Sequence, residues 1–463
     1  MKIDKFLEKF FFKISLTFST FILIYVIIRS DILITTEKLE YYLPFFIFSF
    51  ALFFISFFIK FTKKENKIYV FVIVLSLLFS LYLLEGIIRI FKFDQILYSK
   101  YHNIDKKIQI YEKVNKNKYD TRSIYQVYES LIKKNINAFV KVSPYIFLKK
   151  EAEIFPLSSK SLSKTIYKNE NGYFKIYDSD RYGFNNPDEI WDKSQYDIVL
   201  IGDSFIHGCC VKEEDEIATY LRSHTNGNIL NLGFSSNGPL ISYAALREYL
   251  TKSTAHIFWF YYEGNDIEDL EEEIQNNILN NYLLDRSYSQ NLKKKQKKID
   301  SLVNKEFEKS LDSVRNLNFK KKNFFYNFFD YIKIYKVRNI IKLSLKSLRI
   351  TAKKENTSNY KNIEKIFKEI KTFSLQNKSK LTLVYLPEFK RYINKYDETN
   401  YKKIKQLSKN NNINFIDINK LVFEKENDPL NLFPFKMNGH YNATGYEKIS
   451  KELIKYIDSN FNK

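Results

Sequence analysis

The sequence predicts an α/β fold in which a central parallel sheet carries helices on both faces, preceded by three transmembrane helices. In the second half of the chain, short apolar segments alternate with longer amphipathic ones, which is typical of strands and helices that alternate in a parallel sheet. The first 92 residues contain three long apolar segments with few charges. About 20 apolar residues are enough to cross the hydrocarbon layer of a bilayer.

Five apolar segments are the expected strands of the sheet. The first covers residues 197–201 and ends abruptly in Gly202-Asp203-Ser204. The other four expected strands are residues 228–232, 256–262, 381–386 and 413–418. Amphipathic stretches between and after them predict helices at residues 214–223, 240–251 and 443–459. Because each strand run is short and bounded by turn residues, these segments fit buried strands better than helices.

The three predicted membrane spans cover residues 10–28, 41–59 and 68–84, and the last of them stays apolar to about residue 91. Lysines cluster before the first span and between the second and third. These lysines are Lys2, Lys5, Lys9 and Lys13, and then Lys60, Lys63, Lys64 and Lys67. Since positively charged loops stay in the cytoplasm, we expect everything after about residue 92 to lie outside, on the periplasmic side of an inner membrane.

The expected domains follow from these segments. Residues 1–92 form a membrane anchor, residues 93–190 a connector and accessory region, and residues 191–463 the α/β domain. A lysine-rich helical insertion at about 267–360 interrupts that domain. Its basic amphipathic character fits either a helix on the membrane surface or a helical layer packed over the sheet.

Composition excludes some classes of function. The chain of 463 residues carries a formal charge of +21, but lysine is abundant throughout, so we interpret the charge as solvated surface lysines and expect no nucleic-acid partner. The two cysteines, Cys209 and Cys210, are adjacent. They offer neither a disulfide framework nor metal-ligand spacing, so we expect two small buried side chains. No metal site and no cofactor are predicted.

Four segments in order carry groups suited to acyl transfer. Ser204 ends the first strand, Gly233 follows the second, Asn265 follows the third, and His440 precedes the last helix. The carboxyl ends of parallel strands share one edge, so these groups can converge. A serine hydroxyl needs a base, for which His440 is best placed. An oxyanion needs preorganised donors, which the Ser204 and Gly233 N–H groups and the Asn265 amide could supply.

This order of motifs resembles the SGNH (GDSL-type) hydrolase superfamily over about residues 195–460. The matching segments are Gly202-Asp203-Ser204, Gly233, Gly264-Asn265-Asp266 and His440. The resemblance implies a flavodoxin-like three-layer α/β/α sandwich, with Ser204 as nucleophile, Gly233 and Asn265 as oxyanion donors and His440 as base.

One position departs from the family pattern. The family usually carries an aspartate two or three residues before the histidine, where this chain has Asn438 and Met437. An amide oxygen can accept the imidazole N–H, so Asn438 is the expected orienting group. A separate acid such as Asp428 could replace it, and loss of activity is the remaining alternative.

We therefore expect a membrane-anchored serine esterase or O-acyltransferase that acts outside the cytoplasm. By resemblance, its substrates are ester groups, such as O-acetyl, on cell-surface glycans or lipids, handled through an acyl-serine intermediate. Transfer would need an acyl donor delivered by a membrane partner. The alternative is a catalytically inactive subunit of the same fold that binds glycan or assembles with a polysaccharide-modifying complex.

Overall fold

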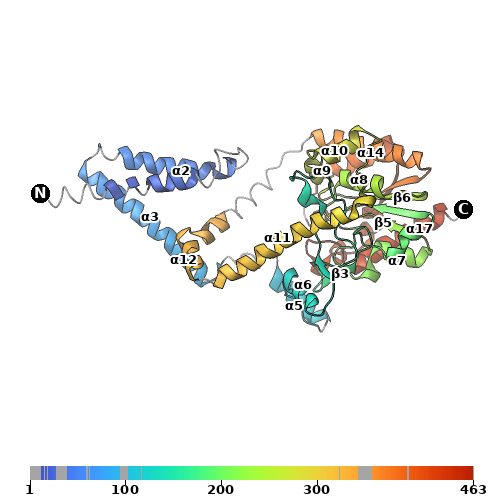
Figure 1. Cartoon of the computed structure of the whole chain (residues 1–463), viewed down its shortest axis with the longest axis horizontal. Coiled ribbons are helices and arrows are strands. Elements are labelled where there is room, and N and C mark those ends of the chain that lie inside the picture. Colours follow the sequence, from blue (N-terminus) through green and yellow to red (C-terminus); the bar gives the residue numbers. More distant parts are fainter. Residues whose placement is uncertain are drawn as a thin grey trace. The chain divides into compact units, whose positions relative to one another are not determined.

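The computed structural model describes most of the chain and divides it into two compact units. The described residues are 12–14, 16, 17, 19–27, 39–58, 61, 63–93, 103–115, 117–322, 324–341, 357–393 and 396–461. The smaller unit comprises Met1–His102 with Phe319–Lys353, and the larger comprises Asn103–Asn318 with Lys354–Lys463. Each unit is described by itself below (Figure 1).

The larger unit contains the predicted parallel sheet. Its strands are β4 (Tyr196–Ile201), β5 (Ile229–Asn231), β6 (Thr254–Tyr262), β7 (Lys380–Leu386) and β8 (Asn414–Asp417). All neighbouring pairs are parallel, in the order β5-β4-β6-β7-β8. Counted along the sheet's own strands this order is 2-1-3-4-5, as in flavodoxin-like sheets. The five predicted strands are thus confirmed to within two residues at every end.

Two separate apolar cores flank this sheet, because alternate residues of each strand point to opposite faces. In β4, Ile198 and Leu200 belong to one core, whereas Val199 and Ile201 belong to the other. Helices α7 (Ile217–Thr225) and α17 (Ala443–Phe461) cover the first face, and α8 (Pro239–Tyr249), α14 (Thr357–Gln376) and α15 (Thr399–Asn410) cover the second (Figure 1). This arrangement is a three-layer α/β fold.

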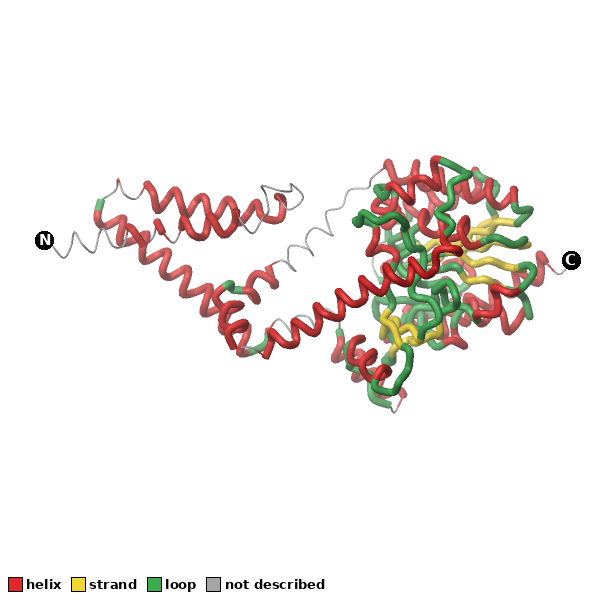
Figure 2. Tube along the Cα trace, in the orientation of Figure 1, coloured by secondary structure: helices red, strands yellow, loops and turns green. Residues whose placement is uncertain are grey.

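A second, smaller sheet occupies the region that the sequence predicted as an irregular connector. It consists of β1 (Ala138–Val140), β2 (Lys164–Asn169) and β3 (Phe174–Asp178), with β1 parallel and β3 antiparallel to β2 (Figure 2). Its strands escaped prediction because β1 has only three residues and the buried run in β2 ends in polar residues. Phe139 of β1 and Ile166 of β2 belong to the same apolar core as the buried residues of α8.

The remaining helices connect or extend these layers. They are α5 (Ile104–Asn115), α6 (Ile124–Ile132), α9 (Asp266–Glu273), α10 (Asn277–Leu284), α11 (Gln296–Lys322) and α16 (Ile418–Leu421). Short 3₁₀ turns fill several loops between them. The predicted lysine-rich insertion begins with α9, α10 and α11. Ile299, Val303 and Phe307 of α11 are buried in the core on the α8 side of the sheet, so this part of the insertion packs over the sheet.

The smaller unit is helical. It contains α2 (Leu39–Phe58), α3 (Lys64–Ile90) and α12 (Phe324–Ile332). Tyr82 of α3 and the end of α12 exchange hydrogen bonds. The Tyr331 hydroxyl donates to the Tyr82 carbonyl at 2.9 Å, and the Tyr82 hydroxyl donates to the Ile332 carbonyl at 2.9 Å. The aromatic helix α12 of the insertion therefore packs against α3. The sequence had suggested only a helix on the membrane surface or a helical layer over the sheet.

No helix within the described ranges is both long enough and apolar enough to cross a membrane. The three predicted spans therefore have no support from the described helices. The first of them, residues 10–28, lies partly outside the described residues.

Candidate active site

Ser204 is presented at the carboxyl end of β4 by a sharp turn. Gly202 has φ +152°, and a Cβ atom there would lie 2.9 Å from the Phe260 carbonyl oxygen of the neighbouring strand. A larger residue would push the turn away from β6. Glycine at position 202 therefore lets β4 end tightly against β6, with Ser204 two residues beyond it.

His440 meets Ser204 across 236 residues of sequence. His440 Nε2 lies 2.7 Å from Ser204 Oγ, which is within hydrogen-bond distance for a base and a hydroxyl. The imidazole packs on the Phe205 ring with centroids 4.6 Å apart. Asp203 Oδ2 is a second, longer acceptor for the Ser204 hydroxyl at 3.3 Å. The structure thus brings together the two residues that the sequence predicted as nucleophile and base.

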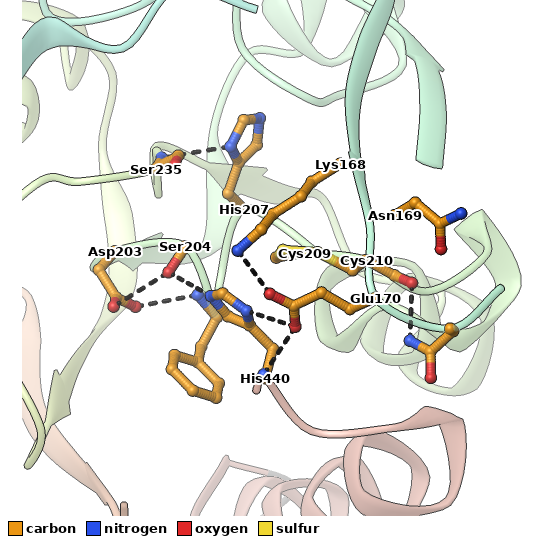
Figure 3. The surroundings of a disulfide bond; sticks show 12 residues. Lys168, Asn169, Glu170, Asp203, Ser204, His207, Cys209, Cys210, Ser235 and His440 are labelled. Carbon is orange, nitrogen blue, oxygen red and sulfur yellow. Dashed lines mark hydrogen bonds and ion pairs between the residues drawn. A yellow bond between two sulfur atoms is a disulfide. The ribbon is translucent and has the colours of Figure 1, made fainter. Parts of the chain in front are cut away.

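The acid that orients His440 is Glu170, which the sequence did not predict (Figure 3). Glu170 Oε2 lies 3.0 Å from His440 Nδ1 and accepts the His440 backbone N–H at 2.9 Å. A carboxylate can only accept, so Nδ1 carries the proton and Nε2 is free to accept from Ser204. Glu170 follows β2 directly, in the hairpin that leads to β3.

This contact corrects the prediction for Asn438. Asn438 is exposed, and no hydrogen bond joins it to His440 in the described part of the chain. The alternative acid, Asp428, instead accepts from Lys436 Nζ at 2.7 Å. A carboxylate from another part of the fold, that of Glu170, occupies the Nδ1 side of the ring instead.

The charges around Glu170 favour its ionised form. Burial alone would raise the pKa of this carboxyl, but His440 and Lys168 outweigh it and hold the pKa well below its usual range. Lys168 Nζ lies 2.6 Å from Glu170 Oε1. The opposite holds for Asp203, whose pKa is raised, chiefly by burial. Glu170 is thus the carboxylate placed to stabilise a protonated His440.

Two of the three predicted oxyanion donors, Gly233 and Asn265, are engaged elsewhere. The Gly233 N–H donates to Asn231 Oδ1 at 2.9 Å, and Asn265 Nδ2 donates to Asp269 Oδ2 at 2.6 Å. A Cβ atom on Gly233 would lie only 1.6 Å from Ile206 Cγ2. Glycine at this position is therefore explained by close packing against the loop that follows Ser204. Neither residue lines the cavity beside Ser204.

Cys209 and Cys210 form a disulfide between neighbours, which corrects the prediction of two unbonded side chains. They pack against Tyr167 and Tyr177 of the smaller sheet. The Cys210 carbonyl accepts from Asn171 Nδ2 at 2.8 Å, which ties the disulfide loop to the hairpin that carries Glu170 (Figure 3).

Glu170, Cys209, Cys210 and His440 are the described residues whose ligand atoms gather as a metal site would require, all within 4.8 Å of one another. Thiolates, not disulfide sulfurs, bind metals. In the bonded form, only Glu170 and His440 of this group keep ligand capacity, and they bond to each other.

His207 plays a packing role three residues after Ser204. Its ring lies between Tyr167 and Phe234, with centroid distances of 4.9 Å and 4.3 Å. His207 Nδ1 accepts the Ser235 N–H at 3.2 Å. Burial, followed by the nearby Lys141 and Lys175, holds the pKa of His207 well below its ordinary value. It lies in the turn after β4, well before α7 begins at Ile217.

Little in the sequence could have identified Glu170. It is one of 53 acidic residues and lies in a short hairpin, 270 positions from His440. The turn residues Asn169, Asn171 and Gly172 do signal a hairpin. They do not indicate where in the fold that hairpin packs.

Comparison with known proteins adds no family to this geometry. No model of a known protein family matches the chain, and no curated protein sequence matches it.

Proposed function

We propose that this chain is a serine-dependent esterase or O-acyltransferase of the SGNH (GDSL-type) class. The observation that carries the proposal is the continuous chain from Ser204 Oγ to His440 Nε2 at 2.7 Å and from His440 Nδ1 to Glu170 Oε2 at 3.0 Å. A hydroxyl, an imidazole and a carboxylate in this order are the groups that acyl transfer through a covalent serine requires.

In the proposed reaction, Ser204 Oγ attacks the carbonyl carbon of an ester while His440 Nε2 takes the hydroxyl proton. Glu170 accepts the Nδ1–H and stabilises the imidazolium that forms. The tetrahedral intermediate collapses, His440 returns the proton to the departing alcohol, and an acyl-serine remains. Water or a sugar hydroxyl then attacks the acyl-serine, with His440 again as base. The bond between the acyl carbon and Ser204 Oγ breaks, and His440 returns the proton to Oγ. Water completes hydrolysis, and a hydroxyl completes transfer.

The oxyanion donors in this proposal are the Ser204 N–H with Gly233 and Asn265, after local rearrangement. In this structure, Gly233 donates to Asn231 and Asn265 donates to Asp269. Catalytic hydrogen bonds often tighten only when substrate is bound. Substrate would therefore have to draw the Asn265 amide away from Asp269.

The proposal places the site outside the cytoplasm, on ester groups of cell-surface glycans or lipids, with the N-terminal region as a multi-pass anchor in the inner membrane. Its support is the sequence: residues 41–59 and 68–84 contain no charged residue, and lysines flank them. A disulfide is also typical of an oxidising compartment. A C-terminal reporter that is active only in the cytoplasm tests this topology, and we expect it to be inactive.

Covalent labelling tests the chemistry. We expect a fluorophosphonate probe to label full-length protein in detergent, with the adduct mapped to Ser204 by peptide mass spectrometry. Ser204→Ala should remove both the adduct and the cleavage of 4-nitrophenyl acetate. Absence of labelling in folded protein would overturn the proposal and favour the non-catalytic glycan-binding alternative.

A further inference from the structure

A cavity of about 280 Å³ opens beside Ser204 and His440. Its other lining residues come from the smaller sheet and from the loop after β5. They are Lys141, Tyr167, Lys168, Ser235 and Ser236. Two lysines therefore line a small cavity that is also lined by the proposed nucleophile, in a volume suited to a short acyl group and part of its alcohol.

Lys141 is the unusual member of this lining. Its Nζ lies 4.5 Å from the centre of the Tyr167 ring and donates to Ser143 Oγ at 2.7 Å. The Phe234 ring lies 5.9 Å away. No carboxylate forms an ion pair with Lys141 among the residues that the structure describes. Burial, followed by the charge of Lys168, lowers the pKa of Lys141 to about 7.

Two other cations of the larger unit with largely buried side chains are paired with carboxylates, whereas the half-buried Arg222 donates to Asn186 Oδ1 and to the Ile229 carbonyl. Lys175, whose side chain is 2% exposed, pairs with Glu216, and Arg391 pairs with Glu263. Lys168 pairs with Glu170, which is itself bound to His440. Lys141 is half-buried and donates to Ser143 Oγ, but it has no such carboxylate among the described residues. A cation in such surroundings without a counter-ion is costly.

We infer that Lys141 is an anion-binding subsite of the Ser204 cavity, and that the preferred substrate is an ester with a carboxylate or similar oxyanion close to the ester bond. The inference rests on the proposed function and narrows its substrate class. The oxyanion could belong to the acyl group or to the sugar that carries it. In either position it would pair with Lys141 and hold the ester carbonyl near Ser204 Oγ.

Two pairs of substrates, in which the carboxylates are either free or methyl-esterified, distinguish these sources. The acyl pair is 4-nitrophenyl hydrogen succinate and 4-nitrophenyl methyl succinate. The alcohol pair is O-acetylated oligogalacturonate and its methyl ester. We expect full-length wild-type protein in detergent to prefer the anionic member of one pair by about tenfold or more in kcat/KM, chiefly through KM, because charge-assisted hydrogen bonds are the strong ones.

Lys141→Met should reduce that preference to about one. Lys160→Met is the matched control, because Lys160 lies over the Phe139 ring at 5.1 Å but does not line the cavity, and it should keep the wild-type ratio. Equal rates within both pairs for wild type, or a preference that survives in Lys141→Met, would overturn the inference while leaving the proposed function intact.

A binding measurement separates the inference from catalysis. Calorimetric titration of Ser204→Ala with O-acetylated oligogalacturonate and with 4-nitrophenyl hydrogen succinate should show tighter binding than their neutral counterparts for one pair. Adding Lys141→Met should remove the difference. If the fluorophosphonate adduct is missing but the preference for anions in binding is retained, the proposed esterase or acyltransferase activity is contradicted and the Lys141 subsite is not. Equal binding of all four compounds would count against the subsite.

Discussion

The two sheets of the larger unit contribute to the site in different ways. The five-stranded sheet supplies Ser204 at the end of β4, whereas the three-stranded sheet supplies Glu170 at the end of β2 and Lys141 just after β1. The first sheet presents the atom that would react. The second presents the groups that orient the base and face the cavity. A site assembled in this way depends on how well the smaller sheet is held against the larger one.

The largest effect should come from breaking the contribution of the smaller sheet. Glu170→Gln keeps the size of the side chain but removes the charge that stabilises imidazolium, so we expect kcat for 4-nitrophenyl acetate to fall by about 10²–10⁴-fold. Glu153→Gln is a matched control, since Glu153 pairs with exposed Lys298 away from the site. If kcat falls by less than about tenfold in Glu170→Gln, the carboxylate of Glu170 is not required for His440 to act as base.

Beside the larger sheet, the substitution Gly233→Ala tests whether glycine is needed at this position for close packing or for catalysis. In Gly233→Ala the new methyl group would overlap Ile206 Cγ2, 1.6 Å away, so we expect the free energy of unfolding to fall by about 3 kcal/mol. Gly233→Ala keeps the backbone N–H, so we expect a loss of stability in denaturant titration rather than the loss of an oxyanion donor. In an Ile206→Ala background the same substitution should cost far less. Equal costs in both backgrounds would contradict the packing explanation.

Lys141, just after β1 of the smaller sheet, should make the stability of the chain depend on pH. With its pKa lowered to about 7, the folded chain binds fewer protons here than the unfolded chain does between pH 7 and about 10.4. Wild-type stability should therefore rise with pH in that interval. Lys141→Met removes this dependence, so its stability relative to wild type should fall by about 2 kcal/mol between pH 6 and pH 9.

Denaturant titrations of both proteins at the two pH values measure this difference. Burial, the largest cause of the lowered pKa of His207, is the same in both proteins, so His207 contributes little to the difference. If the difference in free energy of unfolding between Lys141→Met and wild type is the same at both pH values, the pKa of Lys141 is not lowered and its ammonium is ordinarily solvated.

The same division between the sheets explains what could be predicted from sequence. Strands of the larger sheet are continuous apolar runs, because both of their faces are buried, and Ser204 follows such a run directly. His440 was identified because few histidines exist and one precedes the last helix. Glu170 could not be identified. Its strand is short, and its pairing with His440 spans 270 residues and arises only from tertiary packing. The unbroken apolar runs near the N-terminus favoured membrane spans that the described helices do not support.

The smallest expected effect distinguishes the predicted orienting residue from the observed one. Asn438 is exposed, so Asn438→Ala should change kcat by less than about threefold, as for most surface substitutions. The sharper test is Asn438→Asp in the Glu170→Gln background, which restores an acid where the SGNH family usually carries it. Because His440 Nδ1 faces the β2–β3 hairpin, the new carboxylate should not restore activity. Recovery by more than about tenfold would mean that the loop before His440 can turn to place position 438 against the ring, and that the smaller sheet is one of two routes to the same catalytic geometry.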